Sequence, residues 1–321
     1  MKRLIKLITK LLFILTIILL GFMLFIKIIY PNFNEFRDLY LTHGLLEGFV
    51  PQGLDYLEDE DMIIYCGYMS NGKASRIYTV NNGHTKHYEL YLDEDIEVKG
   101  HTGGITVYND YLYLANDDNT NHAVYIIPVE AVLSNDTHKI ILDDSFVPLS
   151  RASSCFVYDD QLWVGEYHDD NKYPPNPSHI INDEFNSLIV SYDINDDGSL
   201  EDIPSRILAT NNRLQGVDIN SRGDIVLSKS KGFNPSNISF YSNVLNQPYD
   251  MLYNYDGYDI PLWFLDNEHL IDELTLPPMS EEIFYMEDDV ICTYFESASL
   301  KYYYGFLTGG THIYTYHLDN K

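Results

Sequence analysis

Gln52-Gly-Leu-Asp-Tyr56 is the first of five similar segments in this chain. In each segment, one or two small, amide or acidic residues precede a short apolar run. The other four segments are Gly103-Gly-Ile-Thr-Val107, Ser154-Cys-Phe-Val-Tyr158, Gln215-Gly-Val-Asp-Ile219 and Glu281-Glu-Ile-Phe-Tyr285. Successive segments begin 51, 51, 61 and 66 residues apart. A polar turn and a second apolar run follow each segment, which predicts five β-hairpins. Hairpins repeated at this spacing indicate a β-propeller.

The two ends of the chain indicate how the propeller closes. The last hairpin is followed by only one more strand-like segment, residues 311–317, so its blade lacks an outer strand. Residues 36–41, ahead of the first hairpin, form a strand-like segment with no partner. Closure by one terminus removes exposed sheet edges. We therefore expect an all-β fold, a propeller of five four-stranded blades closed by residues 36–41. Six blades or a β-sandwich are the alternatives.

Three segments between the hairpins carry more specific predictions. Residues 139–142 are assigned to the outer strand of the second blade. Residues 169–184 and 243–261 are rich in Pro, Asn or Gly and are predicted to be long loops. Loops on a rigid scaffold often carry binding residues, so we expect these two to form a rim over one face.

The first thirty residues predict a membrane anchor. Four basic residues precede the uninterrupted apolar run, namely Lys2, Arg3, Lys6 and Lys10. Residues 7–30 are long enough to cross a bilayer of about 30 Å. Because a basic flank stays in the cytoplasm, the domain after the span should lie on the other side of the membrane. We therefore expect a single-pass anchor (1–30) in the cell membrane and an extracytoplasmic domain (31–321). A cleaved signal peptide is the alternative, but no A-x-A-like cleavage site follows the apolar run.

The charge of the chain excludes one class of partner. The net charge is −28, and the part after residue 30 holds 15 basic and 48 acidic residues, a net charge of −33. So acidic a surface repels phosphate backbones and argues against nucleic-acid binding. Divalent cations and cationic molecules are better electrostatic partners.

The three cysteines predict no disulfide framework. Cys66, Cys155 and Cys292 form no CxxC pair, and each lies in an apolar run of a different repeat. We expect them to be small buried side chains.

The first residues of the inner strands should gather at one mouth of the channel. The candidate binding residues there are Gln52, His101, Ser154, Gln215, Glu281 and Glu282. Oxygen atoms of Glu281, Gln52 and Gln215 could hold a hard cation such as Ca²⁺. A small-molecule site is a second possibility. The third possibility is that these side chains bind ordered water or form hydrogen bonds to the next blade.

The ends of the second strands predict another ring of polar residues, namely Asn116, Glu166, His168, Ser230 and Glu296. Glu166, His168 and Glu296 are the candidates for acid–base chemistry in this ring. The 11 histidines show no HxH or HExxH spacing, so the sequence predicts no zinc site.

Two propeller families resemble parts of the chain. Val50-Pro-Gln-Gly-Leu-Asp-Tyr56 and Ile77-Tyr-Thr-Val80 resemble the first blade of plant-type glutaminyl cyclotransferases, which implies five blades. Where that family has a Phe-Gly-Glu-Gly motif, this chain has His101-Thr-Gly-Gly104, without the acidic residue that cyclisation needs.

The later repeats are similar to a second group of propellers. The segments Ser191-Tyr-Asp-Ile-Asn-Asp-Asp-Gly-Ser-Leu200 and Leu214-Gln-Gly-Val-Asp-Ile219 resemble blades of gluconolactonase (SMP-30-like) and NHL propellers. In the lactonases, Glu, Asn and Asp side chains hold a divalent ion in the channel. Here Glu281 is the carboxylate at a matching position, whereas Gln52, Ser154 and Gln215 do not reproduce that set.

These observations predict a membrane-tethered, monomeric propeller that binds a ligand or partner and performs no chemistry. A fold of this kind hosts many functions, so the fold alone does not decide among them. The first alternative is a metal-dependent hydrolase of the lactonase type that works through Glu281, Glu282, Gln52, Gln215 and His101. The second is an enzyme similar to glutaminyl cyclotransferases.

Overall fold

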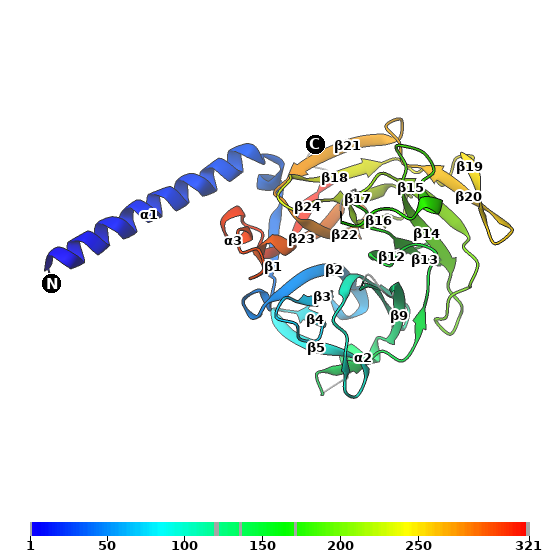
Figure 1. Cartoon of the computed structure of the whole chain (residues 1–321), viewed down its shortest axis with the longest axis horizontal. Coiled ribbons are helices and arrows are strands. Elements are labelled where there is room, and N and C mark those ends of the chain that lie inside the picture. The colour runs from blue at the N-terminus through cyan, green and yellow to red at the C-terminus, as the bar shows by residue number, and fades with distance from the viewer. Residues whose placement is uncertain (1, 119–121, 135–136, 170–171, 319–321) are drawn as a thin grey trace.

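The computed structural model describes residues 2–118, 122–134, 137–169 and 172–318, and in these residues five β-sheets surround a central axis (Figure 1). Each sheet is one blade, and the innermost strands are β2 (Phe49–Leu57), β7 (His101–Tyr108), β12 (Ser154–Tyr158), β16 (Leu214–Ile219) and β22 (Ser280–Glu287). Neighbouring inner strands contact one another around the ring, and β22 contacts β2. The predicted five-bladed propeller is confirmed.

Blade one is larger than predicted. Outward from β2 it contains β3 (Met62–Met69), β4 (Arg76–Asn81) and β5 (His84–Asp93). Two short strands pair with β5, namely β6 (Ile96–Glu97) and, in parallel, β10 (Lys139–Ile141). The assignment of residues 139–142 to blade two was therefore wrong. Ile140 and Leu142 pack into the core between blades one and two, which holds this segment on the edge of blade one.

Blade two closes with a different strand. Outward from β7 it contains β8 (Tyr111–Asp117), β9 (His122–Pro128) and β11 (Ser145–Phe146). Its outer strand is thus two residues long, and it begins just after the segment that joins blade one.

Blade three gains two strands from a distant part of the chain. Outward from β12 it contains β13 (Gln161–Gly165), β14 (Ser187–Asp193), β15 (Arg206–Thr210), β20 (Tyr258–Phe264) and β19 (Met251–Tyr255). Residues 243–261 were predicted to be a loop, and that prediction was wrong. Ile260 and Leu262 alternate with more exposed residues and are buried against blade three. The ring of Phe264 stacks on the ring of Phe185, with centroids 4.4 Å apart. The hairpin covers the edge of β15.

Blade four has the predicted four strands, with β17 (Ile225–Lys229), β18 (Ser236–Tyr241) and β21 (Leu270–Leu276) outward from β16. Blade five contains β22, β23 (Val290–Phe295), β24 (His312–His317) and β1 (Arg37–Leu41). The strand β1 pairs antiparallel with β24, so the amino-terminal segment completes the carboxyl-terminal blade. The predicted closure is confirmed.

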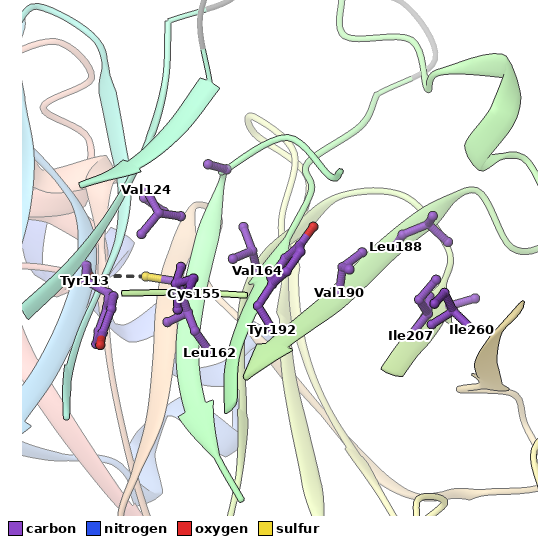
Figure 2. Packing of buried hydrophobic residues seen from close by; sticks show 14 of the residues in the cluster. Tyr113, Val124, Cys155, Leu162, Val164, Leu188, Val190, Tyr192, Ile207 and Ile260 are labelled. Carbon is purple, nitrogen blue, oxygen red and sulfur yellow. Dashed lines mark hydrogen bonds between the residues drawn. The ribbon is translucent and has the colours of Figure 1, made fainter. Parts of the chain in front are cut away.

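In the part of the chain that the structure describes, the hydrophobic core forms five clusters, each between two neighbouring blades. In the cluster of Figure 2, Tyr113 and Val124 of blade two face Cys155 and Leu162 of blade three. Cys155 Sγ donates to the backbone oxygen of Tyr113 at 3.4 Å. Cys66, Cys155 and Cys292 are all buried and free, as predicted.

Close packing of the inner strands explains the glycine in the repeated segment. A Cβ on Gly104 would lie 2.4 Å from the backbone nitrogen of Cys155, and one on Gly53 would lie 2.6 Å from the carbonyl carbon of Gly104. Only glycine permits this approach of one blade to the next.

The aspartate of the same segment joins neighbouring blades. Asp55 Oδ2 accepts a hydrogen bond from the backbone nitrogen of Val107 in blade two at 2.7 Å. Asp218 Oδ2 of blade four accepts a hydrogen bond from the backbone nitrogen of Tyr285 in blade five at 2.6 Å. These two aspartates therefore have a structural role in the repeat.

The helices lie outside the blades. The long helix α1 (Lys2–Ile29) projects away from the propeller (Figure 1), and the short ones are α2 (Glu130–Leu133) and α3 (Gly305–Thr308). Single 3₁₀ turns are η1 (Asn32–Glu35), η2 (Leu45–Glu47), η3 (Glu58–Glu60), η4 (Pro177–His179) and η5 (Glu296–Ala298). The apolar side chains of α1 are exposed apart from Ile26, and its most apolar window has a mean hydropathy of 2.8. Such a helix fits a single-pass membrane anchor or a signal sequence.

Candidate functional site

One mouth of the channel opens into a cavity of about 450 Å³, here called the mouth cavity. Its floor comes from the starts of the inner strands and contains Gln52, His101, Gln215 and Glu281. Its walls come from segments that follow the second strands, at residues 167–169, 172–173, 231–233 and 296–302. A volume of this size is typical of small-molecule sites.

Two glutamates dominate the electrostatics of the mouth cavity. Burial, together with the charges of Glu296 and Glu282, holds the pKa of Glu281 well above its usual range. Burial raises the pKa of Glu296 to about 7, although Lys301 and a hydrogen bond from Gln52 Nε2 at 3.3 Å favour its charged form. The surroundings of Glu281 therefore favour its uncharged form, while Glu296 is partly ionised at neutral pH. Glu281 is 2% exposed, and its Oε1 has no hydrogen-bond partner.

The basic groups of the mouth cavity lie beside aromatic rings. Lys301 Nζ lies 4.8 Å from the ring centroids of both Tyr68 and Tyr302. The ring of His101 lies 4.4 Å from that of Tyr68. Burial and then the charge of Lys301 lower the pKa of His101 to about 4, so this imidazole is neutral at pH 7.

Two ion pairs fix the walls of the cavity. Arg151 Nε donates to Asp117 Oδ2 at 2.7 Å, and Lys231 Nζ donates to Asp169 Oδ1 at 3.0 Å. The charges of these wall residues are thereby balanced within the protein.

The other end of the channel also holds a cavity, of about 590 Å³, here called the opposite cavity. Asp55, Asp218 and Glu282 line it, and all three accept hydrogen bonds from backbone nitrogens of the inner strands. Because these carboxyl groups serve to join blades, the mouth cavity is the stronger candidate for ligand binding.

The predicted mouth residues divide between several places. Gln52, His101, Gln215 and Glu281 line the mouth cavity together. Ser154 is fully buried, and Glu282 faces the opposite cavity, where its Oε1 accepts from the backbone nitrogen of Val217 at 3.2 Å. The structure thus brings together four of the six candidates.

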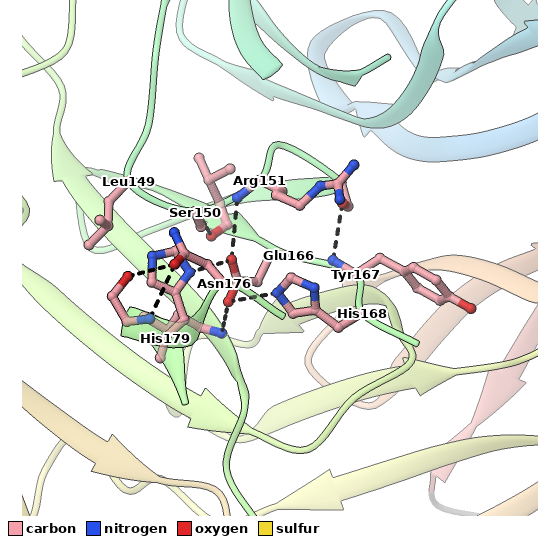
Figure 3. Close-up of polar contacts among 12 residues, drawn as sticks. Leu149, Ser150, Arg151, Glu166, Tyr167, His168, Asn176 and His179 are labelled. Carbon is pink, nitrogen blue, oxygen red and sulfur yellow. Dashed lines mark hydrogen bonds and ion pairs between the residues drawn. The ribbon is translucent and has the colours of Figure 1, made fainter. Parts of the chain in front are cut away.

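The second predicted ring divides as well. Glu296 lies in the mouth cavity, whereas Glu166 and His168 lie buried behind its wall. Glu166 Oε1 is 3.1 Å from His168 Nε2, and Glu166 Oε2 is 2.9 Å from His179 Nδ1 (Figure 3). Burial raises the pKa of Glu166, but the two imidazoles outweigh it and lower this pKa to about 2.

Several residues of these sites were not predicted. His179 belongs to η4 inside the 169–184 insertion, and its distance in sequence from His168 matches no ligand spacing. Lys301 and Tyr302 follow the last hairpin in a Tyr-rich segment with no repeat to align them. The 169–184 loop was expected to form part of a rim over one face, but nothing in the sequence indicated that His179 approaches Glu166 or that Lys301 and Tyr302 line the channel mouth.

The mouth cavity also contains the oxygen atoms that a cation would need. Carboxylate oxygens of Glu281 and Glu296 and amide oxygens of Gln52 and Gln215 could surround a Ca²⁺ ion. The ammonium group of Lys301 lies close enough to affect the pKa of both glutamates, and its charge opposes a cation there.

No protein-family model matches the sequence, and no curated protein matches it. Among solved structures, the fold is similar to aldose sugar dehydrogenase from Streptomyces coelicolor, with 10% identity, a TM-score of 0.47, and coverage of 87% of this chain and 96% of the other. The fold is also similar to that of an oxidoreductase (glucose dehydrogenase) from Thermus thermophilus, with 11% identity, a TM-score of 0.46, and coverage of 87% of this chain and 98% of the other.

A third similar structure is glutaminyl cyclase from Myxococcus xanthus, with 7% identity, a TM-score of 0.42, and coverage of 80% of this chain and 90% of the other. This chain spans 58% of a further match, Kuenenia stuttgartiensis hydrazine synthase. Similarity at these identities and TM-scores concerns at most the fold and carries no conclusion about activity.

Proposed function

We propose that this chain is a membrane-tethered propeller that binds a small, neutral, polyhydroxylated molecule in the mouth cavity. The observation that carries the proposal is the carboxyl group of Glu281, which is buried in a concave site and has an oxygen without a hydrogen-bond partner. Leaving such a group unpaired costs about 1–3 kcal/mol, so a ligand that hydrogen-bonds to it recovers that free energy.

The balance of charge favours a neutral ligand. The ion pairs of Asp117 and Asp169 neutralise two acidic residues of the wall. Lys301 lies beside the ionisable Glu296, and the raised pKa of Glu281 favours the uncharged form of that group. Apart from these paired groups, a ligand with a full charge would meet, among the described residues, only the exposed ammonium group of Lys172 in exchange for its hydration, which favours a neutral ligand.

The remaining lining residues suit a molecule with many hydroxyl groups. Gln52 and Gln215 offer donors and acceptors, and protonated Glu281 can donate and accept. The rings of Tyr173, Tyr302 and Phe233 offer apolar faces for C–H groups. The cavity volume of about 450 Å³ suits a mono- or disaccharide.

The proposed tether is the segment 1–30, with residues 31–321 on the extracytoplasmic side. Support comes from the exposed apolar surface of α1 and the four basic residues before its apolar run. The native cysteines are buried, so an engineered cysteine on the surface would be the reactive one. A membrane-impermeant maleimide should label Glu58→Cys on intact cells, and Lys6→Cys only after permeabilisation. The reverse pattern, or a mature mass lacking the first thirty residues, would contradict the tether.

Ligand binding is tested with the full-length chain in detergent micelles and a panel of probes. The panel contains neutral mono- and disaccharides, the charged sugar acid gluconate, glutamate and CaCl₂. Saturation at about 100 times the dissociation constant stabilises the folded state by about 2.7 kcal/mol, so at least one neutral sugar should raise the melting temperature measurably.

Glu281→Ala should remove this shift, while Glu287→Ala, at the other end of the same strand, should keep it. If no neutral sugar changes the melting temperature, or if Glu281→Ala responds as the parent does, the proposal is wrong. A shift with CaCl₂ alone that Glu281→Ala abolishes would replace it with the cation site of the lactonase alternative.

A further inference from the structure

Two histidines and a glutamate converge behind the wall of the mouth cavity. Glu166 and His168 directly follow β13, and His179 ends the 3₁₀ turn η4 in the 169–184 insertion. All three side chains are almost completely buried. One ligand atom from each lies within 4.8 Å of the other two. Figure 3 shows both imidazoles pointing toward the carboxylate of Glu166 from different segments of the chain.

Hydrogen bonds within the protein satisfy this cluster only in part. Glu166 accepts from the backbone nitrogen of Leu188 at 2.9 Å and contacts His179 Nδ1 at 2.9 Å. His168 Nε2 lies at ion-pair distance from Glu166 Oε1, 3.1 Å, without the geometry of a hydrogen bond, and His168 Nδ1 has no hydrogen-bond partner. A buried imidazole nitrogen without a hydrogen bond is unfavourable by about 1–3 kcal/mol.

The geometry points to a divalent metal site, and we propose that Glu166, His168 and His179 bind one Zn²⁺ ion. Two imidazole nitrogens and one carboxylate oxygen are a ligand set that suits zinc, with water at a fourth position. A cation placed between these atoms would use the unpaired nitrogen of His168 and neutralise the buried carboxylate. The outer ring nitrogens, His168 Nδ1 and His179 Nε2, are where ordered water would bind.

The position of the site gives the metal a structural effect. Side chains alternate along the segment after β13, so Tyr167 and Asp169 line the mouth cavity while Glu166 and His168 face the cluster. His179 would join the far part of the insertion to this segment through the ion. The metal would therefore fasten the insertion to blade three and hold one wall of the mouth cavity in place.

The experiment measures metal content and Co²⁺ spectra of the full-length chain in detergent. After exposure to Zn²⁺ and dialysis, the parent should retain about one zinc per chain. His179→Gln should retain at least about tenfold less. His138→Gln, which changes an exposed histidine of blade one, should bind as the parent does. Co²⁺ added to the metal-free parent should give the visible absorption of a nitrogen- and oxygen-ligated site.

Two measurements keep the test decisive if His179→Gln fails to fold. A chelator should lower the melting temperature of the parent, and Zn²⁺ should restore it. A zinc content near zero in the metal-exposed parent, with no Co²⁺ absorption, would overturn the proposal and leave a hydrogen-bonded cluster. Zinc retained equally by folded His179→Gln would overturn it as well. Because these readouts need no sugar, they do not depend on the proposed function.

Discussion

The ring of Phe36 stacks on the ring of Tyr316, with centroids 4.8 Å apart and planes inclined by 29°. Phe36 immediately precedes β1, and Tyr316 lies on β24, so this contact joins the two ends of the propeller. Phe33 adds edge contacts to Phe295 and Tyr314 of the same blade. The closure of the ring therefore depends on side-chain packing as well as on the β1–β24 hydrogen bonds.

Phe36→Ala should destabilise the whole domain. Removing a buried aromatic ring costs about 3–5 kcal/mol, and for a domain of this size that corresponds to a fall in melting temperature of roughly 5–10 °C. The measurement is thermal unfolding followed by circular dichroism. Leu41→Ala, at a half-exposed position of the same strand, is the matched control and should have little effect. Equal melting temperatures for parent and Phe36→Ala would show that β1 does not close the ring.

Gly104→Ala should be far more harmful than an ordinary glycine substitution. The added methyl group would lie 2.4 Å from the backbone nitrogen of Cys155, and neither strand can move without separating two blades. We expect a loss above about 3 kcal/mol, or failure to fold. Gly72→Ala, at a turn with φ of 79° and open space around it, should cost only about 1 kcal/mol. Similar losses in urea unfolding for both variants would contradict the inter-strand contact.

Stability should decrease as the pH rises from 4 to 7. Burial raises the pKa of Asp55 to about 6, although backbone hydrogen bonds from Tyr56 and Val107 lower it. The unfolded chain has the ordinary Asp pKa of about 3.9, so this stabilising contribution is complete below pH 4 and is lost as the pH passes through 6. Asp218 and Glu282 face the same channel and have raised pKa values too.

The variant Asp55→Asn isolates the contribution of this one group. Its free energy of unfolding should decrease with pH less steeply than that of the parent, by about 2–3 kcal/mol over this interval. Urea titrations at several pH values measure the difference. Parallel curves for the two proteins would show that Asp55 titrates normally in the folded state.

How much the sequence could predict depended on whether a feature was local. The repeated segments from Gln52 onward, the closing strand and the apolar helix are short-range patterns, and the structure contains them all. The pairing of β20 with β15 was missed because no repeat aligns residues 243–261 with another blade, and the Asn and Pro content of this segment resembles a loop. The approach of His179 to Glu166 was missed for the same reason, since loop folding brings them together.

Glu281→Gln should stabilise the ligand-free protein near neutral pH. The substitution replaces a buried carboxyl group, whose ionisation is opposed by burial and by neighbouring glutamates, with a neutral amide of similar shape. We expect a gain of about 1 kcal/mol at pH 8, which should shrink toward pH 5, because a glutamate in the unfolded chain has a pKa of about 4.3 and begins to hold its proton there too. Thermal unfolding at the two pH values measures this gain. A loss of stability at pH 8 would mean that Glu281 has a structural role.

Calorimetric titration of the neutral sugar that most stabilises the parent is the most direct test of the mouth cavity as the binding site. Parent, Glu281→Ala and Glu287→Ala are titrated side by side in the same detergent. The account predicts at least about tenfold weaker binding, or about 1.4 kcal/mol, for Glu281→Ala and unchanged affinity for Glu287→Ala. The same dissociation constant for all three proteins would contradict it.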